Sequence, residues 1–305
     1  MTISARATIL ITLLFTEVKT MWILTAIFQA IGQALTWVLP ISESGHSAIF
    51  HNFSGRFSGA CSQLTGVIHI GIAIGIIAAF YKLFLHLGKN FFTAWNDLFH
   101  KRLDIKKSSP QRKFMYMTIL SFVPMLFYLI PAGKYGNVFQ VFHRTSYDNT
   151  LLGEGICIAL TGVLLIVTES MLNKKSKSLP PVLQALIIGI IAFLAIPSAG
   201  CSLIAGVFCV AFLLGMSDKY AIRYSMVLSA MVLLVMGVIE ICIGVTKINI
   251  ISAIIGVVIS AVVSFFAVKL LLYVIKNKSL KFFAWYDIAL GLICFVIGIF
   301  EIVIK

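Results

Sequence analysis

Apolar stretches long enough to cross a lipid bilayer recur along most of this chain, and they decide what it can fold into. A helix needs about 20 residues to cross the hydrocarbon core of a membrane. Hydrophobic residues make up 60% of the 305 residues and charged residues only 11%, whereas a soluble domain carries about 25% charged residues. The apolar runs are continuous rather than alternating, which favours helices over the strands of a membrane barrel. These segments lie near residues 22–39, 46–60, 64–85, 115–130, 151–172, 182–196, 202–215, 224–246, 249–275 and 284–304.

Two pairs of these segments are short and meet at a break rich in proline, glycine and serine. The first break is residues 40–46, P-I-S-E-S-G-H, and the second break is residues 197–202, P-S-A-G-C-S. Irregular backbone at membrane depth is tolerated where it is buried in protein or lines a polar cavity. We therefore predict an all-α polytopic membrane protein with two re-entrant helix hairpins and about six transmembrane helices.

The net charge of +13 is concentrated in four loops between apolar segments. The positive-inside rule places such loops on the cytoplasmic side, and their lysines and arginines suit anionic lipid headgroups. This distribution indicates a membrane protein and argues against a nucleic-acid partner. The four loops are residues 86–114, 173–180, 216–223 and 276–283.

The order of elements repeats along the chain, which predicts two inverted repeats in a single membrane domain. A hairpin and two spans over residues 22–130 are followed by a hairpin and two spans over residues 182–275. Inverted repeats with broken helices bind their ligands near the middle of the membrane. We expect the membrane domain to cover residues 21–305, with residues 1–20 as an extension or a misassigned start.

The first break carries the ionisable side chains that most favour a functional site. Glu43 and His46 are three residues apart and share one helix face if this segment is helical. Ionisable groups inside a membrane are costly and usually serve function, and free backbone N–H groups at helix starts suit a phosphate. For Ser42 and Ser44 alone, the capping of helix ends is the simpler interpretation.

The second break offers a turn and hydroxyl groups but no charge, through Ser198, Gly200 and Ser202. The six cysteines have no metal-binding spacing, so we predict neither a metal site nor a disulfide from them.

Other polar residues within the apolar segments have simpler interpretations. His69 fits a buried structural residue as well as a functional one. Glu154 and Glu240 lie near predicted span ends, where we expect them at the membrane interface. Trp285 and Tyr286 are typical of an interfacial aromatic belt.

From residue 33 to residue 46 the sequence reads Q-A-L-T-W-V-L-P-I-S-E-S-G-H. It resembles the bacterial undecaprenyl-diphosphate phosphatase family, the bacitracin-resistance proteins, which reads E-G-L-T-E-F-L-P-[IV]-S-S-[ST]-G-H there. The similarity continues through about residue 304, in the segments 67–71, 119–124, 162–169, 217–228 and 282–291. The resemblance implies a fold with two inverted re-entrant hairpins and a multi-pass location in the bacterial inner membrane. It also implies the dephosphorylation of undecaprenyl diphosphate to undecaprenyl phosphate, which recycles a lipid carrier in cell-wall synthesis.

The chain departs from the family pattern at several catalytic positions. The two glutamates of the family fall on Gln33 and Trp37, and the arginine of its second motif falls on Cys201. Ser42, Gly45 and His46 are retained. On this basis the predicted catalytic residues are His46, Glu43 and Ser42, and the predicted substrate-binding residues are Gln33, Ser44, Gly45, Ser198, Gly200 and Ser202.

Two functions remain open from the sequence. One is an undecaprenyl-diphosphate phosphatase with a rearranged site. The alternative is a catalytically impaired relative that binds or translocates polyprenyl phosphate lipids, because phosphoryl transfer relies on positioned positive charge and the arginine is absent. The partner in either case is a polyprenyl phosphate or diphosphate lipid. A divalent cation such as Mg or Ca is left open as a cofactor, and a homodimer is left open as the assembly.

Overall fold

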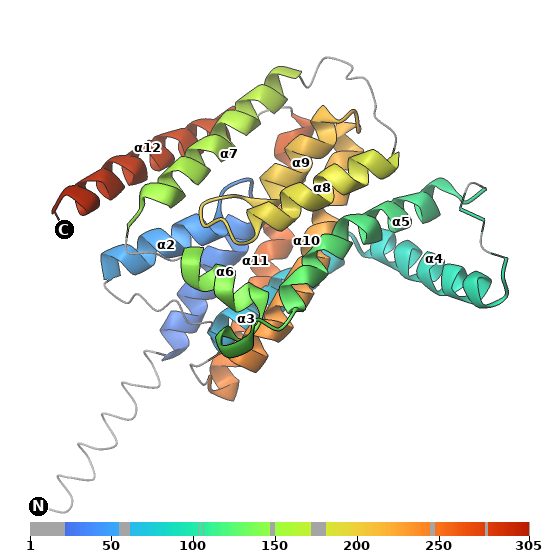
Figure 1. The fold of residues 1–305 in the computed structure, drawn as a ribbon, viewed down its shortest axis with the longest axis horizontal. Coiled ribbons are helices and arrows are strands. Elements are labelled where there is room, and N and C mark those ends of the chain that lie inside the picture. The colour runs from blue at the N-terminus through green and yellow to red at the C-terminus, as the bar shows by residue number, and fades with distance from the viewer. Residues whose placement is uncertain are drawn as a thin grey trace, which may run out of the picture.

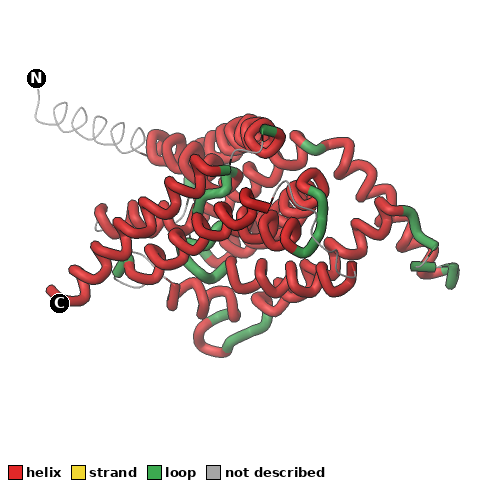
Figure 2. Tube along the Cα trace, turned by 90° about the horizontal axis from the view of Figure 1, so that it is seen from above, coloured by secondary structure: helices red, strands yellow, loops and turns green. Residues whose placement is uncertain are grey.

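The computed structural model describes residues 22–54, 62–102, 104–105, 107–146, 150–171, 181–244, 248–277 and 280–304. The extension predicted at residues 1–20 lies outside the described residues. The described chain is a bundle of helices joined by short loops, as Figures 1 and 2 show, so the predicted all-α class is confirmed. The helices are Trp22–Val38, α2 (Glu43–Ser54), α3 (Gln63–Ala79), α4 (Tyr81–Phe99), α5 (Pro110–Phe122), α6 (Val138–Ser146), α7 (Leu152–Met171), α8 (Pro181–Ala195), α9 (Leu203–Leu213), α10 (Asp218–Ile243), α11 (Ile250–Lys276) and α12 (Lys281–Ile304), with 3-10 turns η1 (Val123–Leu129) and η2 (Gly133–Tyr135).

Four helices within the described residues are long and apolar enough to cross a membrane: α7, α10, α11 and α12. A fifth span results if the bent pair α3 and α4 is counted as one. These helices confirm a polytopic membrane protein. Their lengths of 20, 26, 27 and 24 residues correspond to about 30 to 40 Å of helix, which matches or exceeds the hydrocarbon core.

The predicted span at residues 64–85 ends too late in the sequence, because the chain turns sharply at Phe80. α3 and α4 meet at an angle of 94°, and α4 continues to residue 99, through part of the segment predicted to be a loop. α4 exposes Phe92 and Trp95. It is tied to α5 by an ion pair of 2.8 Å between Asp97 and Arg112. In Figure 1 these two helices extend to the right of the bundle.

Small residues let the long helices approach one another closely. α7 and α12 run side by side at the upper left of Figure 1. A Cβ atom at Gly155 of α7 would lie 2.8 Å from the carbonyl oxygen of Gly291 in α12, and one at Gly291 would lie 2.7 Å from that of Gly155. Small residues at such crossings are typical of membrane helices, whose association depends on van der Waals packing. α3 packs in the same close way between α10 and α11.

The two helix pairs that flank the breaks are short, as the sequence predicts. α8 has 15 residues and α9 has 11, so each is at most about 22 Å long and cannot cross a hydrocarbon core of about 30 Å. α2 has 12 residues. Both α2 and α9 pack against α7, which brings the starts of the two helices together. The re-entrant hairpins and the inverted repeats stay predictions that these lengths support.

Candidate active site

A buried serine in each break caps the helix that begins directly after that serine. The Ser42 hydroxyl accepts a hydrogen bond of 3.0 Å from the backbone N–H of Gly45. The Ser202 hydroxyl accepts one of 3.3 Å from the N–H of Ala205. In both cases the donor is the third residue of the helix, which is the usual geometry of a serine N-cap. The starts of α2 and α9 are therefore built in the same way.

The two breaks contact each other directly, although about 160 residues separate them in sequence. The backbone N–H of Gly200 donates to the Ser44 hydroxyl at 3.1 Å. The Ser42 hydroxyl lies 3.4 Å from the carbonyl oxygen of Cys201 and 3.2 Å from the Ser44 hydroxyl. The structure thus brings together residues of both predicted motifs.

Two glycines permit this contact. A Cβ atom at Gly45 would lie 3.1 Å from the Cα of Gly200 and 2.8 Å from the Ile158 side chain. Gly200 has φ of +96°, and a Cβ atom there would lie 2.6 Å from the carbonyl oxygen of Glu154 and 2.9 Å from the Cβ of Cys157. Position 200 therefore requires glycine for two reasons. Its backbone is left-handed, and α7 lies too close to leave room for a side chain.

His46 is held at both ring nitrogens. Nδ1 lies 2.6 Å from the carbonyl oxygen of Ser42, and Nε2 lies 2.7 Å from the Tyr286 hydroxyl. A carbonyl oxygen can only accept a hydrogen bond, so Nδ1 carries the proton and Nε2 presents a lone pair to the Tyr286 hydroxyl. The two rings are stacked, with centroids 5.8 Å apart. Nε2, the ring nitrogen of His46 that can gain a proton, therefore faces Tyr286 of α12.

Tyr286 is a site residue that sequence reasoning missed, because it was expected only in an interfacial belt. It lies 240 residues from His46 along the chain, and nothing in the local pattern indicates this contact. Its neighbour Trp285 is mostly exposed, as the belt prediction expects.

Glu43 is the first residue of α2 and is half-buried. Its carboxylate accepts a hydrogen bond of 2.9 Å from the Ser47 hydroxyl, one turn further along the same helix. Glu43 and His46 lie on one helix, as predicted, but each is held by different partners. The two groups can therefore take separate roles.

The remaining predicted substrate-binding residues lie around the contact between the two breaks rather than in it. The Ser198 hydroxyl donates back to the carbonyl oxygen of Leu194, at 2.7 Å within its own chain segment. Gln33 lies on the helix before the first break, is 7% exposed, and has a buried side-chain oxygen without a hydrogen-bond partner among the described residues.

The polar contacts found at the two breaks, over the part of the chain that the structure describes, involve no lysine or arginine. A phosphate bound here would meet hydroxyl groups, backbone N–H groups and the His46 ring. In the same described residues, no group of three or more His, Cys, Asp or Glu side chains is placed to hold a metal ion.

A second polar cluster lies in the interior of the bundle and includes Glu240. Glu240 is 3% exposed and lies in the last turn of α10. Its carboxylate lies 2.7 Å from Nδ1 of His69. A carboxylate in an apolar helix is thus paired with a group from another helix, and the membrane interface stays a prediction for Glu240. Glu154 is also 3% exposed and lies in the first turn of α7, where the interface likewise stays a prediction.

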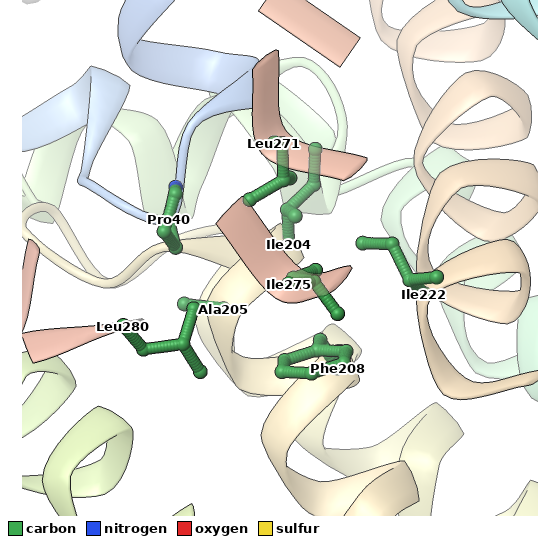
Figure 3. A pocket seen from close by; sticks show the side chains of 8 residues that line it. All are labelled: Pro40, Ile204, Ala205, Phe208, Ile222, Leu271, Ile275 and Leu280. Carbon is green, nitrogen blue, oxygen red and sulfur yellow. The ribbon is translucent and has the colours of Figure 1, made fainter. Parts of the chain in front are cut away.

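A pocket near the first break is entirely apolar and offers nothing to a phosphate. Figure 3 shows it between Pro40 of the first break and side chains of α9, α10 and α11. It has no room for a water molecule. The chemistry therefore belongs to the polar contact between the breaks and not to this pocket.

The sequence is similar to known proteins over most of its length. The profile of the family described as bacitracin resistance protein BacA matches residues 26–293. A protein of Halothermothrix orenii named undecaprenyl-diphosphatase is 29% identical over 290 residues, which cover 93% of this chain and 98% of that protein. Proteins with the same name from Methanosphaera stadtmanae and Methanococcus vannielii are each 29% identical, over 91% and 90% of this chain and 98% of each relative.

Proposed function

The chain belongs to the family of bacitracin resistance protein BacA, and we propose that it is an undecaprenyl-diphosphate phosphatase. It converts the membrane lipid undecaprenyl diphosphate to undecaprenyl phosphate and inorganic phosphate. This reaction recycles the lipid carrier of cell-wall synthesis, and we propose the bacterial inner membrane as the location of this multi-pass protein. The relatives that carry this enzyme name align over nearly their whole length. Assembly as a homodimer stays a prediction.

The observation that carries the proposal is the direct contact of the two breaks beside His46. The first N–H groups of α2 have no partner within the helix, and a helix start favours an anion. The Ser44 hydroxyl lies at the point where Gly200 of the second break arrives. The terminal phosphate of the lipid fits this place, with His46 and Glu43 on the same helix.

His46 supplies the positive charge in our proposal. Its Nδ1–H is fixed on the Ser42 carbonyl, so a proton gained at Nε2 makes an imidazolium. The imidazolium Nε2–H then donates to the Tyr286 hydroxyl, and the proton of that hydroxyl is free to donate to a phosphate oxygen. Charge that develops on the phosphate oxygens in the transition state is stabilised by donors already in place. His46 thus replaces part of what an arginine provides elsewhere.

Glu43 acts as the general base. Its carboxylate takes a proton from a water molecule while the water oxygen bonds to the terminal phosphorus. The bond from that phosphorus to the bridging oxygen breaks at the same time, and the lipid phosphate leaves with the electron pair. Ser42 is 1% exposed and caps α2, so it holds the first break in shape.

The direct experiment measures phosphate release from undecaprenyl diphosphate by the purified protein in detergent micelles, with and without divalent cations. His46→Ala should lower the rate by about 10³-fold and Glu43→Gln by about 10²-fold. His100→Ala is the matched control, because His100 is exposed at the end of α4 and bonds only to its own helix.

Measuring lipid binding alongside phosphate release separates the proposed phosphatase from the alternative function. A protein that binds the lipid tightly but releases no phosphate would be the binding or translocating relative. Equal rates in the wild type, His46→Ala and Glu43→Gln would place the activity outside the first break.

A further inference from the structure

The helix α4 leaves the bundle sideways and carries an exposed apolar face that the proposed function does not use. α3 and α4 meet at 94°, and Figure 1 shows α4 extending away from the bundle below α5. Among the residues of α4, all of which the structure describes, only Ala94 is buried. Phe92 is 72% exposed and Phe99 is 68% exposed. Apolar surface exposed to this extent marks an interaction site.

The exposed apolar side chains of α4 form one stripe along the helix. Leu85, Phe92 and Phe99 follow one another at intervals of about two turns, and Trp95 lies between the last two on the same side. The ring centroids of Trp95 and Phe99 are 5.2 Å apart, and those of Phe91 and Trp95 are 6.2 Å apart. All five side chains are exposed. The stripe is therefore a continuous apolar surface, mostly aromatic, that its own protein leaves uncovered.

The other exposed face of α4 is polar. The side chains of Asn90 and Thr93 donate to the carbonyl oxygens of His86 and Lys89, at 2.8 Å and 2.7 Å within the same helix. Such bonds satisfy a polar side chain on its own backbone. Lys82 and Lys89 lie about two turns apart on this face, and both are exposed. α4 is therefore an amphipathic helix whose apolar and polar faces are both open.

α3, which leads into α4, runs beside α11 in the same direction. A Cβ atom at Gly71 would lie 3.0 Å from the Cα of Val257, and one at Gly75 would lie 3.0 Å from the backbone nitrogen of Phe265. Later residues of α3 thus meet later residues of α11. This register gives the level at which α3 ends along a helix that is long enough to cross the membrane.

The bend at Phe80 lies where the hydrocarbon core ends. Phe80 follows Gly75 by little more than one turn, which puts it level with about Lys269 in α11. The helix from Ile250 to Lys269 is about 30 Å long, which is the thickness of the hydrocarbon core. Lys269 is also the first charged residue of α11. A helix at 94° to α3 at this level lies along the membrane surface.

The charges on and after α4 favour one kind of membrane surface. Lys82, Lys89 and the basic pair at residues 101–102 are all exposed. Asp97, the one carboxylate of α4, is engaged by Arg112 of α5 at 2.8 Å. The polar side of α4 therefore carries a net positive charge. Basic groups in this position attract anionic lipid headgroups.

We propose that α4 is an interfacial anchor, with its apolar stripe among the acyl chains and with Lys82 and Lys89 on anionic phospholipid headgroups. The leaflet is the cytoplasmic one, where such basic segments lie. Buried apolar area and attraction to anionic lipid both strengthen the binding of an amphipathic helix. The Asp97–Arg112 ion pair joins the anchor to α5, which packs against α8 and α10. α4 thus sets the depth of the bundle in the membrane, independently of the proposed function.

Trp95 allows the depth of α4 to be measured. The full chain and Trp95→Phe are reconstituted in vesicles of phosphatidylcholine and phosphatidylglycerol whose acyl chains carry bromine either near the headgroup or near the chain end. The fluorescence difference between the two proteins reports Trp95, because the other tryptophans are common to both. Bromine near the headgroup should quench this difference about twofold more than bromine near the chain end, since an interfacial helix stays close to the headgroups.

Two results of this measurement would overturn the proposal. Stronger quenching by bromine near the chain end would mean that α4 continues the span of α3 into the membrane. Absence of quenching by either lipid would mean that water or a second copy of the chain covers the stripe.

The headgroup preference is tested by removing single charges at exposed positions. Phosphatidylglycerol is titrated into detergent micelles that hold the full chain, and the thermal unfolding temperature is followed. The lipid concentration at half of the temperature rise should increase about fivefold in Lys89→Gln, and further in the double variant with Lys82→Gln, because each lysine at the surface contributes to the attraction. Lys134→Gln is the matched control, since Lys134 is an exposed lysine in η2, outside α4.

The control decides whether the lipid responds to α4 or to the net charge of the protein. Lys134→Gln should behave as wild type, and titration with phosphatidylcholine should not distinguish the variants. Equal shifts in Lys89→Gln and Lys134→Gln, or no shift in the double variant, would overturn the assignment of α4 to anionic headgroups.

Discussion

The starts of α2 and α9 have the same backbone construction but different side chains. Each begins directly after a serine of a break, and that serine accepts a hydrogen bond from the third N–H of the helix. The first turn then reads E-S-G-H in α2 and L-I-A-G in α9. The second break therefore contributes shape, through Gly200 and its N–H, and the first contributes the groups that can react. An anion site at a helix start becomes a candidate active site only when ionisable side chains accompany it.

The largest effect that tests this difference should come from Gly200→Ala. The new Cβ would overlap the backbone of α7, and the left-handed backbone alone costs an alanine about 1–2 kcal/mol. The second break must then move away from Ser44, and a displacement of this kind can lower the rate about 100-fold. Phosphate release and the thermal unfolding temperature in detergent should both fall.

Gly206→Ala is the control for that substitution. A Cβ atom at Gly206 of α9 would meet its nearest neighbour at an ordinary 3.8 Å, so activity should be preserved and the helix slightly favoured. Equal behaviour of the two variants would contradict the role assigned to Gly200.

A positive charge added to the second break should give the start of α9 a side chain that can act on phosphate, as the start of α2 has. Cys201→Arg places a guanidinium next to the carbonyl that faces Ser42, and this group can bind phosphate with two parallel hydrogen bonds. Phosphate release should rise about tenfold. Cys201→Met adds similar length without charge and should not raise the rate. A fall in both variants would show that the second break has no room for a side chain directed at the phosphate.

The sequence predicts the parts of this comparison that are local. Proline, glycine and serine mark both breaks, and the cost of burying Glu43 and His46 favours the first break as the reactive one. Contacts between distant segments carry no such signal, so the Tyr286 bond to His46 and the pairing of His69 with Glu240 were missed. The turn at Phe80 was missed for another reason: sharp kinks usually follow proline or glycine, and neither residue precedes it directly.

A smaller effect should follow from Tyr286→Phe, which tests whether the first break depends on α12. The change removes the hydroxyl that binds Nε2 of His46 at 2.7 Å and keeps the stacked ring. Loss of one hydrogen bond of this kind should lower kcat about fivefold. Trp285→Phe is the control, because Trp285 is exposed next to Tyr286 and should leave kcat unchanged. Equal rates for Tyr286→Phe and wild type would remove α12 from the site.

The smallest effect should come from Ser198→Ala, although the sequence predicts Ser198 as a substrate-binding residue. Its hydroxyl bonds to the Leu194 carbonyl four residues earlier, as serines near helix ends often do, so it satisfies its own segment and not the first break. The rate should change less than about twofold. Ser44→Ala, by contrast, removes the acceptor of the Gly200 N–H and should lower the rate several-fold in the same assay, by roughly the value of one hydrogen bond. If Ser198→Ala lowered the rate more than Ser44→Ala, the second break would bind substrate through its side chains. It would then contribute more than the shape of the site.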